Sequence, residues 1–303
     1  MLTICLPVYR FDPTALVREL VRQAAALPHP VEVLVYDDAS PAQDRAAYQP
    51  GLQALCGQGV SYRLLPENLG RAAIRNLLAR EAAHEALLFL DADSGIVRTD
   101  FLAAYLQAVA ETAAPLLMGG RVYAQEPPAD PVKLLHWHYG HRRESRSAEE
   151  RRRRPWHGFM SNNFLVRRDL LLRHPFDETI AGYGHEDTLW ALQLHRAGVT
   201  GIVHLDNPVV HLDLEEATVF LDKQRRATEN LRRLLRDHPY LETRLSAAVK
   251  RLRKWSIWGL TQVPLRWAAP TLQRQLTAHP KGAFWRLDLL KLHWLAQADK
   301  VKE

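Results

Sequence analysis

The chain has 303 residues, of which 47% are hydrophobic and 24% are charged. This composition excludes a disordered chain and suits one large domain with an appendage. The two cysteines, Cys5 and Cys56, are too few for a disulfide framework or for a metal site made of cysteine alone.

The N-terminal sequence lacks the features of a secretory signal. It has no basic segment before the apolar residues 2–8 and no small-residue cleavage site. No stretch approaches the 18 apolar residues from which a membrane-spanning helix is predicted. We therefore expect a cytoplasmic protein.

The first half of the chain alternates between strand and helix patterns. Residues 2–8 and 31–36 are short, apolar and rich in β-branched side chains, which predicts two buried strands. Between them, residues 13–27 place apolar side chains at helical spacing. Residues 60–65 predict a third strand, and the Ala- and Leu-rich residues 70–84 predict a helix.

The alternation continues toward the middle of the chain. Residues 86–90 predict a buried strand and residues 101–111 a helix. Further strands are expected at 116–123 and 159–166. Between these two lies the polar, basic segment 124–157, which we expect to be a mobile loop that becomes ordered over bound ligands, because connections are usually much shorter. A short surface helix is the alternative.

The last third begins with one helix and two short strands and then becomes helical. The helix is expected at 186–196 and the strands at 201–205 and 208–212. From residue 214 the pattern is helical to the end. Prolines predict breaks in these helices near Pro239, Pro264, Pro270 and Pro280.

These elements predict an α/β domain with a mostly parallel sheet, over residues 1–212, and a helical extension over 213–303. The extension differs in composition from the rest of the chain. Residues 241–303 contain 12 Lys and Arg against 4 Asp and Glu, and five of the eight Trp. Such a segment suits either a membrane surface or a helical lid whose Trp side chains pack inward.

Acidic residues follow two of the predicted strands, at the edge where open α/β sheets bind ligands. Asp91 and Asp93 are two positions apart after the strand 86–90, and carboxylates so placed can hold a hard divalent cation. Asp38 follows the strand 31–36 and could accept hydrogen bonds from a nucleoside. Asp91 and Asp93, and likewise Asp38, could instead belong to an ordinary solvated turn.

A second acidic pair stands at the start of the helix 186–196. Glu186 and Asp187 follow Gly182 and Gly184, so they could present a general base or simply cap the helix. Histidines at 204 and 211 lie in the two short strands that follow. A lone histidine is more often structural than a ligand.

Six short motifs occur in an order typical of one enzyme family. They are Leu-Pro-Val-Tyr at 6–9, Val-Tyr-Asp-Asp-Ala-Ser at 35–40, Asn-x-Gly-x-x-x-x-Arg-Asn at 68–76, Leu-Asp-Ala-Asp at 90–93, Gly-x-Gly-x-Glu-Asp at 182–187 and Val-Val-His at 209–211. Over 1–212 the chain thereby resembles bacterial family 2 glycosyltransferases. The resemblance implies the GT-A fold, a Rossmann-like, mostly parallel sheet flanked by helices.

The resemblance also implies a nucleotide-sugar site at the first strands. Pro7 and Tyr9 would line the base pocket and Asp38 would hold the base. Asn68 belongs to the same site, and Arg75 would lie near the diphosphate.

The remaining motifs imply the reacting centre. Asp91 would contact the ribose or the sugar, and Asp93 and His211 would bind Mn or Mg. Asp187 matches the family's catalytic base, with Glu186 beside it facing the acceptor. Residues 94 and 95 are Ser and Gly where many members have another acid, which leaves fewer carboxylates for the metal. His204 is expected to be structural.

The implied activity is inverting transfer of a sugar from a nucleotide diphosphate, with UDP favoured, to a hydroxyl of a glycan or a lipid-linked acceptor. A sugar nucleotidyltransferase is the nearest alternative enzyme, but no Gly-rich phosphate loop follows the first strand. A non-catalytic nucleotide-sugar-binding module is the other alternative. No nucleic-acid motif accompanies the run Arg151–Arg154, which we expect to be a solvated face with no nucleic-acid partner. Peripheral membrane contact is expected only through 213–303.

Overall fold

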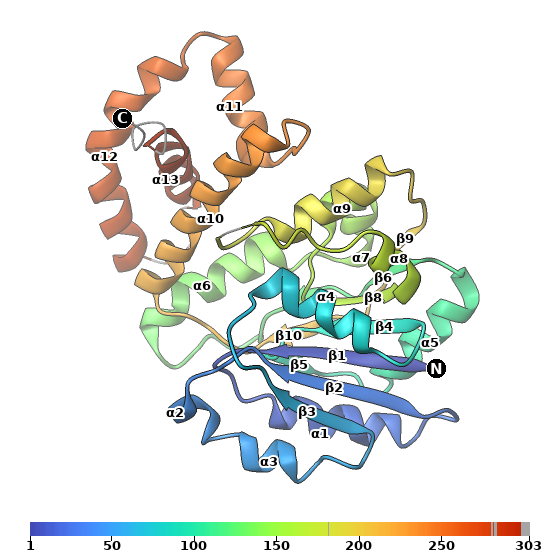
Figure 1. Cartoon of the computed structure of the whole chain (residues 1–303). Coiled ribbons are helices and arrows are strands. Elements are labelled where there is room, and N and C mark those ends of the chain that lie inside the picture. Colours follow the sequence, from blue (N-terminus) through green and yellow to red (C-terminus); the bar gives the residue numbers. More distant parts are fainter. Residues whose placement is uncertain (181, 280, 282–283, 298–303) are drawn as a thin grey trace. The chain divides into compact units, whose positions relative to one another are not determined.

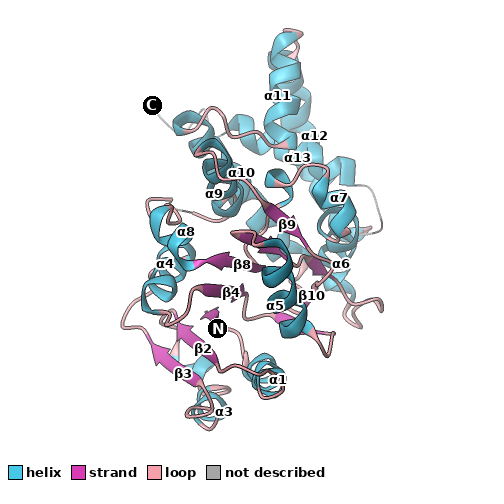
Figure 2. Ribbon diagram, turned by 90° about the vertical axis from the view of Figure 1, so that its right-hand side faces the viewer, coloured by secondary structure: helices cyan, strands magenta, loops and turns pink. Residues whose placement is uncertain are grey.

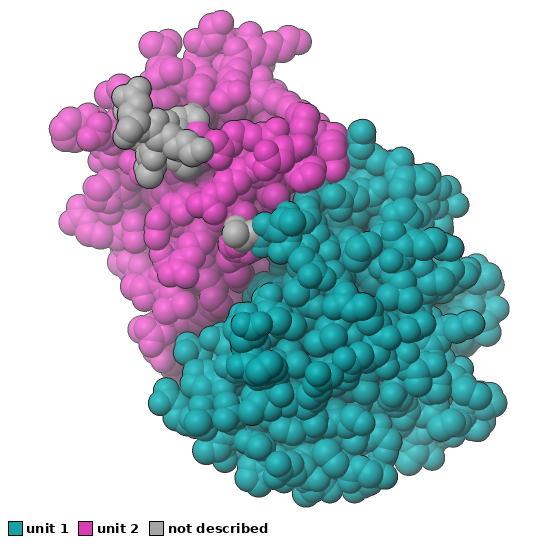
Figure 3. Space-filling view, viewed as in Figure 1, with its two compact units in different colours: residues 1–124, 145–180, 186–213 teal, residues 125–144, 181–185, 214–303 magenta. Residues whose placement is uncertain are grey.

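The computed structural model describes residues 1–180, 182–279, 281 and 284–297 (Figure 1). The chain divides into two compact units, coloured separately in Figure 3. Unit 1 comprises residues 1–124, 145–180 and 186–213, and unit 2 comprises residues 125–144, 181–185 and 214–303.

Unit 1 is built on a sheet of seven strands in the order β3-β2-β1-β4-β8-β6-β9. The strands are β1 (Leu2–Val8), β2 (Val31–Asp37), β3 (Val60–Leu64), β4 (Ala86–Leu90), β6 (Leu116–Met118), β8 (Asn163–Arg167) and β9 (Ile202–His204). Strands β1 to β4 are mutually parallel and β6 is parallel to β9, whereas β8 is antiparallel to both its neighbours. The mostly parallel α/β sheet is confirmed.

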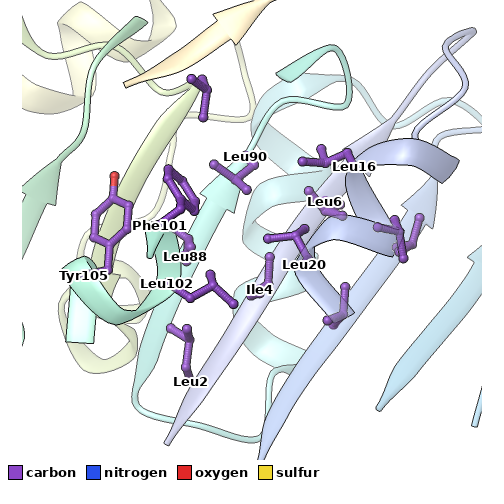
Figure 4. Close-up of a cluster of buried hydrophobic side chains, with 14 of the residues drawn as sticks. Leu2, Ile4, Leu6, Leu16, Leu20, Leu88, Leu90, Phe101, Leu102 and Tyr105 are labelled. Atoms are coloured by element: carbon purple, nitrogen blue, oxygen red, sulfur yellow. The ribbon is translucent and has the colours of Figure 1, made fainter. Parts of the chain in front are cut away.

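Helices cover both faces of this sheet (Figures 1 and 2). Alternate residues of β1 point to one face, where they pack with α1 (Thr14–Ala24) and α5 (Phe101–Thr112). Figure 4 shows Leu16 and Leu20 of α1 and Phe101 of α5 against these strands. The opposite face carries α4 (Arg71–Glu81), α8 (Arg168–Arg173) and α9 (Glu186–Arg196).

A second, smaller sheet lies in the same unit. Its strands are β5 (Ser94–Ile96), β10 (Val209–His211) and β7 (Arg121–Val122), in that order. We expected one strand over 116–123, but β6 and β7 are separated at Gly119-Gly120. Gly120 has a φ of 96°, and a Cβ on Gly119 would lie 2.4 Å from the Asn163 amide. The chain can therefore turn here into the small sheet.

The segment expected to be a mobile loop, 124–157, is mostly helical, so that prediction was wrong. It contains η1 (Pro131–Lys133), α6 (Leu134–Tyr139), the π turn η2 (Gly140–Glu144) and α7 (Ala148–Arg152), and η3 (Trp156–Gly158) follows. A complete capping box between Ser147 and Glu150 starts α7. Two further short helices, α2 (Ala42–Arg45) and α3 (Gln49–Gln53), follow β2.

Arg151 on α7 explains why this part of the segment is ordered. Its side chain is 4% exposed, and its guanidinium donates to the carbonyls of Gly119 at 3.0 Å and Leu205 at 2.7 Å. The four-arginine run is therefore not a uniformly solvated face. Buried charges persist only when they are hydrogen-bonded, and here backbone carbonyls meet that need.

Unit 2 is helical, as expected for the C-terminal extension. Its long helices are α10 (Ala217–Asp237), α11 (Arg244–Lys254), α12 (Trp258–Ala278) and α13 (Phe284–Gln297). Helices α10, α12 and α13 share a core to which α6 contributes Leu135. The break near Pro239 is present, but Pro264 and Pro270 lie inside α12, so those two breaks were wrongly predicted. Pro280 lies outside the described residues. Across the helices that the structure describes, none combines the length and apolarity needed to span a bilayer.

Candidate active site

Three parallel strands end at the same edge of the large sheet. Because β1, β2 and β4 run in one direction, the residues after them, Tyr9, Asp38 and Asp91, share that edge. Pro7 pairs in register with Tyr36 of β2. The Tyr9 side chain is 48% exposed, with the Arg10 guanidinium 5.3 Å from its ring centroid.

Asp38 fastens the loop before α4 to the end of β2. Its two carboxylate oxygens accept hydrogen bonds from the backbone N–H groups of Leu69 at 2.7 Å and Gly70 at 3.0 Å. Asn68 donates from its side chain to the Asp38 carbonyl at 2.9 Å. Burial raises the pKa of Asp38 above its ordinary value, and the two N–H donors partly offset this. The Asp38 and Asn68 predicted for nucleotide binding are thus brought together.

Asp91 is held by two arginines. Arg75 of α4 is 3% exposed and donates from Nη2 to Asp91 Oδ1 at 2.9 Å. Arg121 of β7 lies with its Nη2 3.5 Å from Asp91 Oδ2. About a third of the Asp91 side chain remains exposed, so this carboxylate is oriented by charge while still reachable by a ligand.

The small sheet brings Asp93 to His211. Strand β10 pairs antiparallel with β5 so that His211 is opposite Ser94, and the Leu212 N–H donates to the Asp93 carbonyl at 2.9 Å. As a result His211 Nδ1 lies 3.2 Å from Asp93 Oδ2. The buried Tyr123 ring packs edge-on against the imidazole, with centroids 5.3 Å apart.

Charge around Asp93 favours its ionised form. Burial alone would raise the pKa of Asp93, but the hydrogen bond and charge of His211 lower it. The positive charges of Arg121 and Arg71 add to this effect, and the resulting pKa is below the ordinary value. An ionised carboxylate beside an imidazole is a donor pair suited to a divalent cation.

The residues present fit a metal ion with two protein donors. Within the described ranges, no three side chains of His, Cys, Asp or Glu converge as a metal site. Asp93 and His211 are adjacent, however, and the other positions around a cation can be filled by water or by phosphate oxygens of a ligand. The pair would thus hold Mn or Mg only together with such oxygens.

Glu186 and Asp187 form the first turn of α9. Burial raises the pKa of Asp187 to about 6, and the neighbouring Glu186 charge adds to the rise. Asp187 Oδ1 accepts the Thr188 N–H at 2.6 Å. Glu186 is 8% exposed, with its Oε1 3.5 Å from Arg71 Nη1, while its buried Oε2 has no hydrogen-bond partner among the described residues.

Arginines of α4 connect the two acidic pairs. The positive charge of Arg75, which holds Asp91, also favours the ionised form of Asp187. Arg71, which faces Glu186, likewise favours ionised Asp93. The predicted acids of the reacting centre are therefore influenced by the charges of Arg75 and Arg71 on the same helix. An acid whose pKa lies near neutrality in such a cluster can accept a proton.

Asn162 is a candidate that the sequence did not indicate. Its carbonyl accepts the Asp91 N–H at 3.0 Å, and its side chain is 3% exposed. Neither the Nδ2 nor the Oδ1 of this amide has a hydrogen-bond partner in the part of the chain that the structure describes. Buried amides are normally satisfied, so this amide, in the residue next to the Asp91 backbone, is a candidate for binding a ligand. Arg71 and Arg121 were also missed.

His204 is structural, as expected. It is 1% exposed in β9, where its Nε2 lies 3.0 Å from the Pro155 carbonyl and its Nδ1 lies 3.3 Å from Arg151 Nε. Burial, together with the charge of Arg151, lowers the pKa of His204 to about 4. A neutral imidazole thus helps to hold α7 and η3 in place.

Comparison with solved structures finds the same fold in nucleotide-sugar enzymes. The mannosyltransferase PcManGT from Pyrobaculum calidifontis, solved with GDP-Man and Mn2+, is 17% identical, with a TM-score of 0.58 over 100% of this chain and 88% of that one. Mannosyl-3-phosphoglycerate synthase from Rubrobacter xylanophilus is 16% identical, with a TM-score of 0.55 over 80% and 76% of the two chains. Glucosyl-3-phosphoglycerate synthase from Mycobacterium tuberculosis, solved with Mn2+ and UDP, is 16% identical, with a TM-score of 0.51 over 78% of each chain.

A search of curated proteins finds no match for the chain. Residues 3–174, more than half of the sequence, match the family described as Glycosyl transferase family 2. That span includes β1, β4 and the arginines of α4, whereas Asp187 and His211 come after it. The chain therefore belongs to glycosyl transferase family 2, has the GT-A fold and is a glycosyltransferase.

Proposed function

We propose that this glycosyltransferase moves a sugar from a nucleotide diphosphate to an acceptor hydroxyl with inversion at the anomeric carbon. The observation that carries the proposal is Asp187, an acid with a pKa of about 6 at the first turn of α9, linked through Arg75 to Asp91 at the strand edge. A base with this pKa is ionised at neutral pH and can still accept a proton.

In the proposed reaction, the acceptor oxygen forms a bond to the anomeric carbon as the bond between that carbon and the diphosphate oxygen breaks. Asp187 takes the acceptor's proton, and the nucleotide diphosphate leaves with the bonding electron pair. Glu186 faces the acceptor, and its unsatisfied Oε2 suits a second hydroxyl donor. Arg75 and Arg121 keep Asp91 oriented toward the ribose or sugar.

Asp93 and His211 are the proposed protein ligands of Mn or Mg. When bound, such an ion would neutralise charge on the departing diphosphate. Imidazole favours Mn over Mg, because Mg prefers oxygen donors. The structures of PcManGT and of glucosyl-3-phosphoglycerate synthase with Mn2+ support a divalent cation of this kind.

UDP is the proposed nucleotide of the donor, with Pro7, Tyr9, Asp38 and Asn68 at the nucleoside. The exposed ring of Tyr9 offers a stacking surface for a base. The similar structures include one with GDP-Man and one with UDP, so calorimetry should compare UDP, GDP, dTDP and CDP. A clear preference for GDP would exclude the UDP assignment.

The proposed acceptor is a hydroxyl of a glycan or a lipid-linked sugar, used in the cytoplasm during polysaccharide synthesis. Asn162 is proposed to hydrogen-bond the donor's sugar or ribose, because its buried amide has no partner among the described residues and its backbone carbonyl accepts the Asp91 N–H.

The decisive test measures nucleotide release and product configuration together. Purified protein is incubated with a panel of UDP- and GDP-sugars, Mn and candidate acceptors, and the anomeric configuration of the product is read by NMR. The proposal expects inversion and dependence on Asp187. Retention of configuration, or transfer that survives the loss of Asp187, would refute it.

A further inference from the structure

Helix α12 has apolar side chains on two opposite faces. One face is buried and comprises Leu265, Ala269, Leu272 and Leu276, of which the last three pack into the core of unit 2. The other face is open: Leu260, Val263 and Trp267 are 75%, 65% and 81% exposed. These three residues follow the spacing i, i+3, i+7, so they form one stripe along the helix.

The residue after α11 is also apolar and exposed. Trp255 is 66% exposed, and together with Leu260, Val263 and Trp267 it forms what we call the outer surface of α12. Among the large hydrophobic residues of the described chain, only Met1 and Val97 are also more than 60% exposed. A helix with apolar residues on both faces normally has a partner on each, and contiguous exposed apolar residues mark an interaction site.

The charge around this surface identifies the partner. From residue 243 to residue 287 the sequence contains no Asp or Glu. The same stretch contains nine basic residues: Arg244, Lys250, Arg251, Arg253, Lys254, Arg266, Arg274, Lys281 and Arg286. Those on α11 and α12 are all exposed. An exposed apolar stripe with Trp, in a stretch of chain that has Lys and Arg but no Asp or Glu, is complementary to an anionic lipid surface.

We propose that the outer surface of α12 docks onto an anionic bilayer, with the helix lying in the interface. Tryptophan rings suit the headgroup layer, and Leu260 and Val263 would reach the upper acyl region. The helix is not apolar enough to span the bilayer, in agreement with a position on its surface. The surface belongs wholly to unit 2, so the inference is independent of the proposed transfer reaction.

The test is co-sedimentation of the full chain with vesicles, without donor, acceptor or metal. At low salt, the wild type is expected to partition at least ten-fold more strongly onto vesicles with about one third anionic lipid than onto neutral ones, and added salt is expected to release it. Leu260→Gln with Trp267→Gln should lower partitioning at least ten-fold. Both side chains are exposed, so circular dichroism and the Tm should not change.

Trp285→Ala is the matched control. Trp285 is 56% exposed, but it lies on α13, three residues before Asp288, and so on a face that carries an acid. The Trp285→Ala variant should bind vesicles like the wild type. Equal sedimentation with neutral and anionic vesicles, or undiminished binding by the Leu260/Trp267 variant, would overturn the proposal. A third result would also overturn it: the wild type stays in solution as an oligomer, and the Leu260/Trp267 variant is a monomer. The surface would then join copies of the chain.

Discussion

Replacing Asp187 by Asn tests both the mechanism and the electrostatics from which it is inferred. Asn keeps the size of the side chain and can still accept the Thr188 N–H through Oδ1, but it cannot take a proton. Turnover should fall by roughly two to four orders of magnitude, the usual effect of losing a general base. The affinity for UDP should stay within a few-fold, because the binding residues are untouched.

The same change should make the protein more stable. The Asp187 pKa of about 6 lies some two units above the unfolded value near 3.9, and each unit corresponds to about 1.4 kcal/mol. Removing this charge would therefore raise the free energy of unfolding by at most about 3 kcal/mol at pH 8. Because the Asp187 side chain is partly exposed, we expect about 1–2 kcal/mol.

The sign of the pH dependence follows from the raised pKa. Between the unfolded and folded values the native state binds the extra proton, so wild-type stability falls as pH rises from about 4 through 6. The gain in Asp187→Asn should accordingly be largest above pH 7 and shrink toward zero near pH 4. Wild-type kcat/KM should fall as pH drops below about 6. The small residual rate of Asp187→Asn should not change over that pH range.

Thermal unfolding at several pH values and turnover with a saturating donor provide the measurements. Asp130→Asn is the control, since Asp130 is an exposed cap that accepts the Val132 N–H. It should change neither quantity. Turnover of Asp187→Asn within a few-fold of wild type would show that Asp187 is only a cap. If Asp187→Asn were less stable than wild type at pH 8, burial would not disfavour the ionised form of Asp187.

Four further substitutions test other parts of the site. Asn162→Ala should weaken donor binding about ten-fold without lowering the Tm, because its amide has no partner to lose. The adjacent Asn163 donates from its side-chain amide to the carbonyls of Gly120 and Asn207, so Asn163→Ala should lose about 2–4 kcal/mol of stability. Equal losses of Tm in the Asn162 and Asn163 variants would contradict the assignment of Asn162 to ligand binding. His211→Ala should weaken Mn binding measured by calorimetry, with activity partly rescued at high Mn; unchanged Mn affinity would make His211 structural. Arg75→Lys keeps the charge but loses the guanidinium Nη2 that donates to Asp91, so the donor KM should rise about ten-fold and kcat should change less, whereas unaltered kinetics would leave Arg75 a purely structural role.

The sheet was predictable because its strands are short, apolar and bounded by turn residues. Strands β1, β2 and β4 and helix α9 lie within a residue or two of their expected ranges. The prolines of α12 were misleading, since the sequence cannot show that tertiary packing through Leu265 and Leu272 holds the helix across them. The segment 124–157 was misjudged because its order depends on Arg151, a charged residue whose carbonyl partners are distant in sequence.

The site was only partly predictable for a related reason. The acids that end strands could be named from the sequence, because parallel strands bring their ends to one edge. Asn162 could not, since its significance lies in hydrogen bonds that it does not make. The arginines at 71 and 121 also needed the fold, because only the packing of α4 and the small sheet brings them to the acids.

The small sheet of β5, β10 and β7 has a consequence for local dynamics. Its strands have only two or three residues each, yet their pairing brings His211 next to Asp93, the residue before β5. So few backbone hydrogen bonds should open far more often than the large sheet does. A cation bound by both side chains would make this local opening of the small sheet less frequent. Amide hydrogens of Ser94–Ile96 and Val209–His211 should therefore exchange quickly without metal and slow down when Mn is added, while those of β1 remain protected throughout.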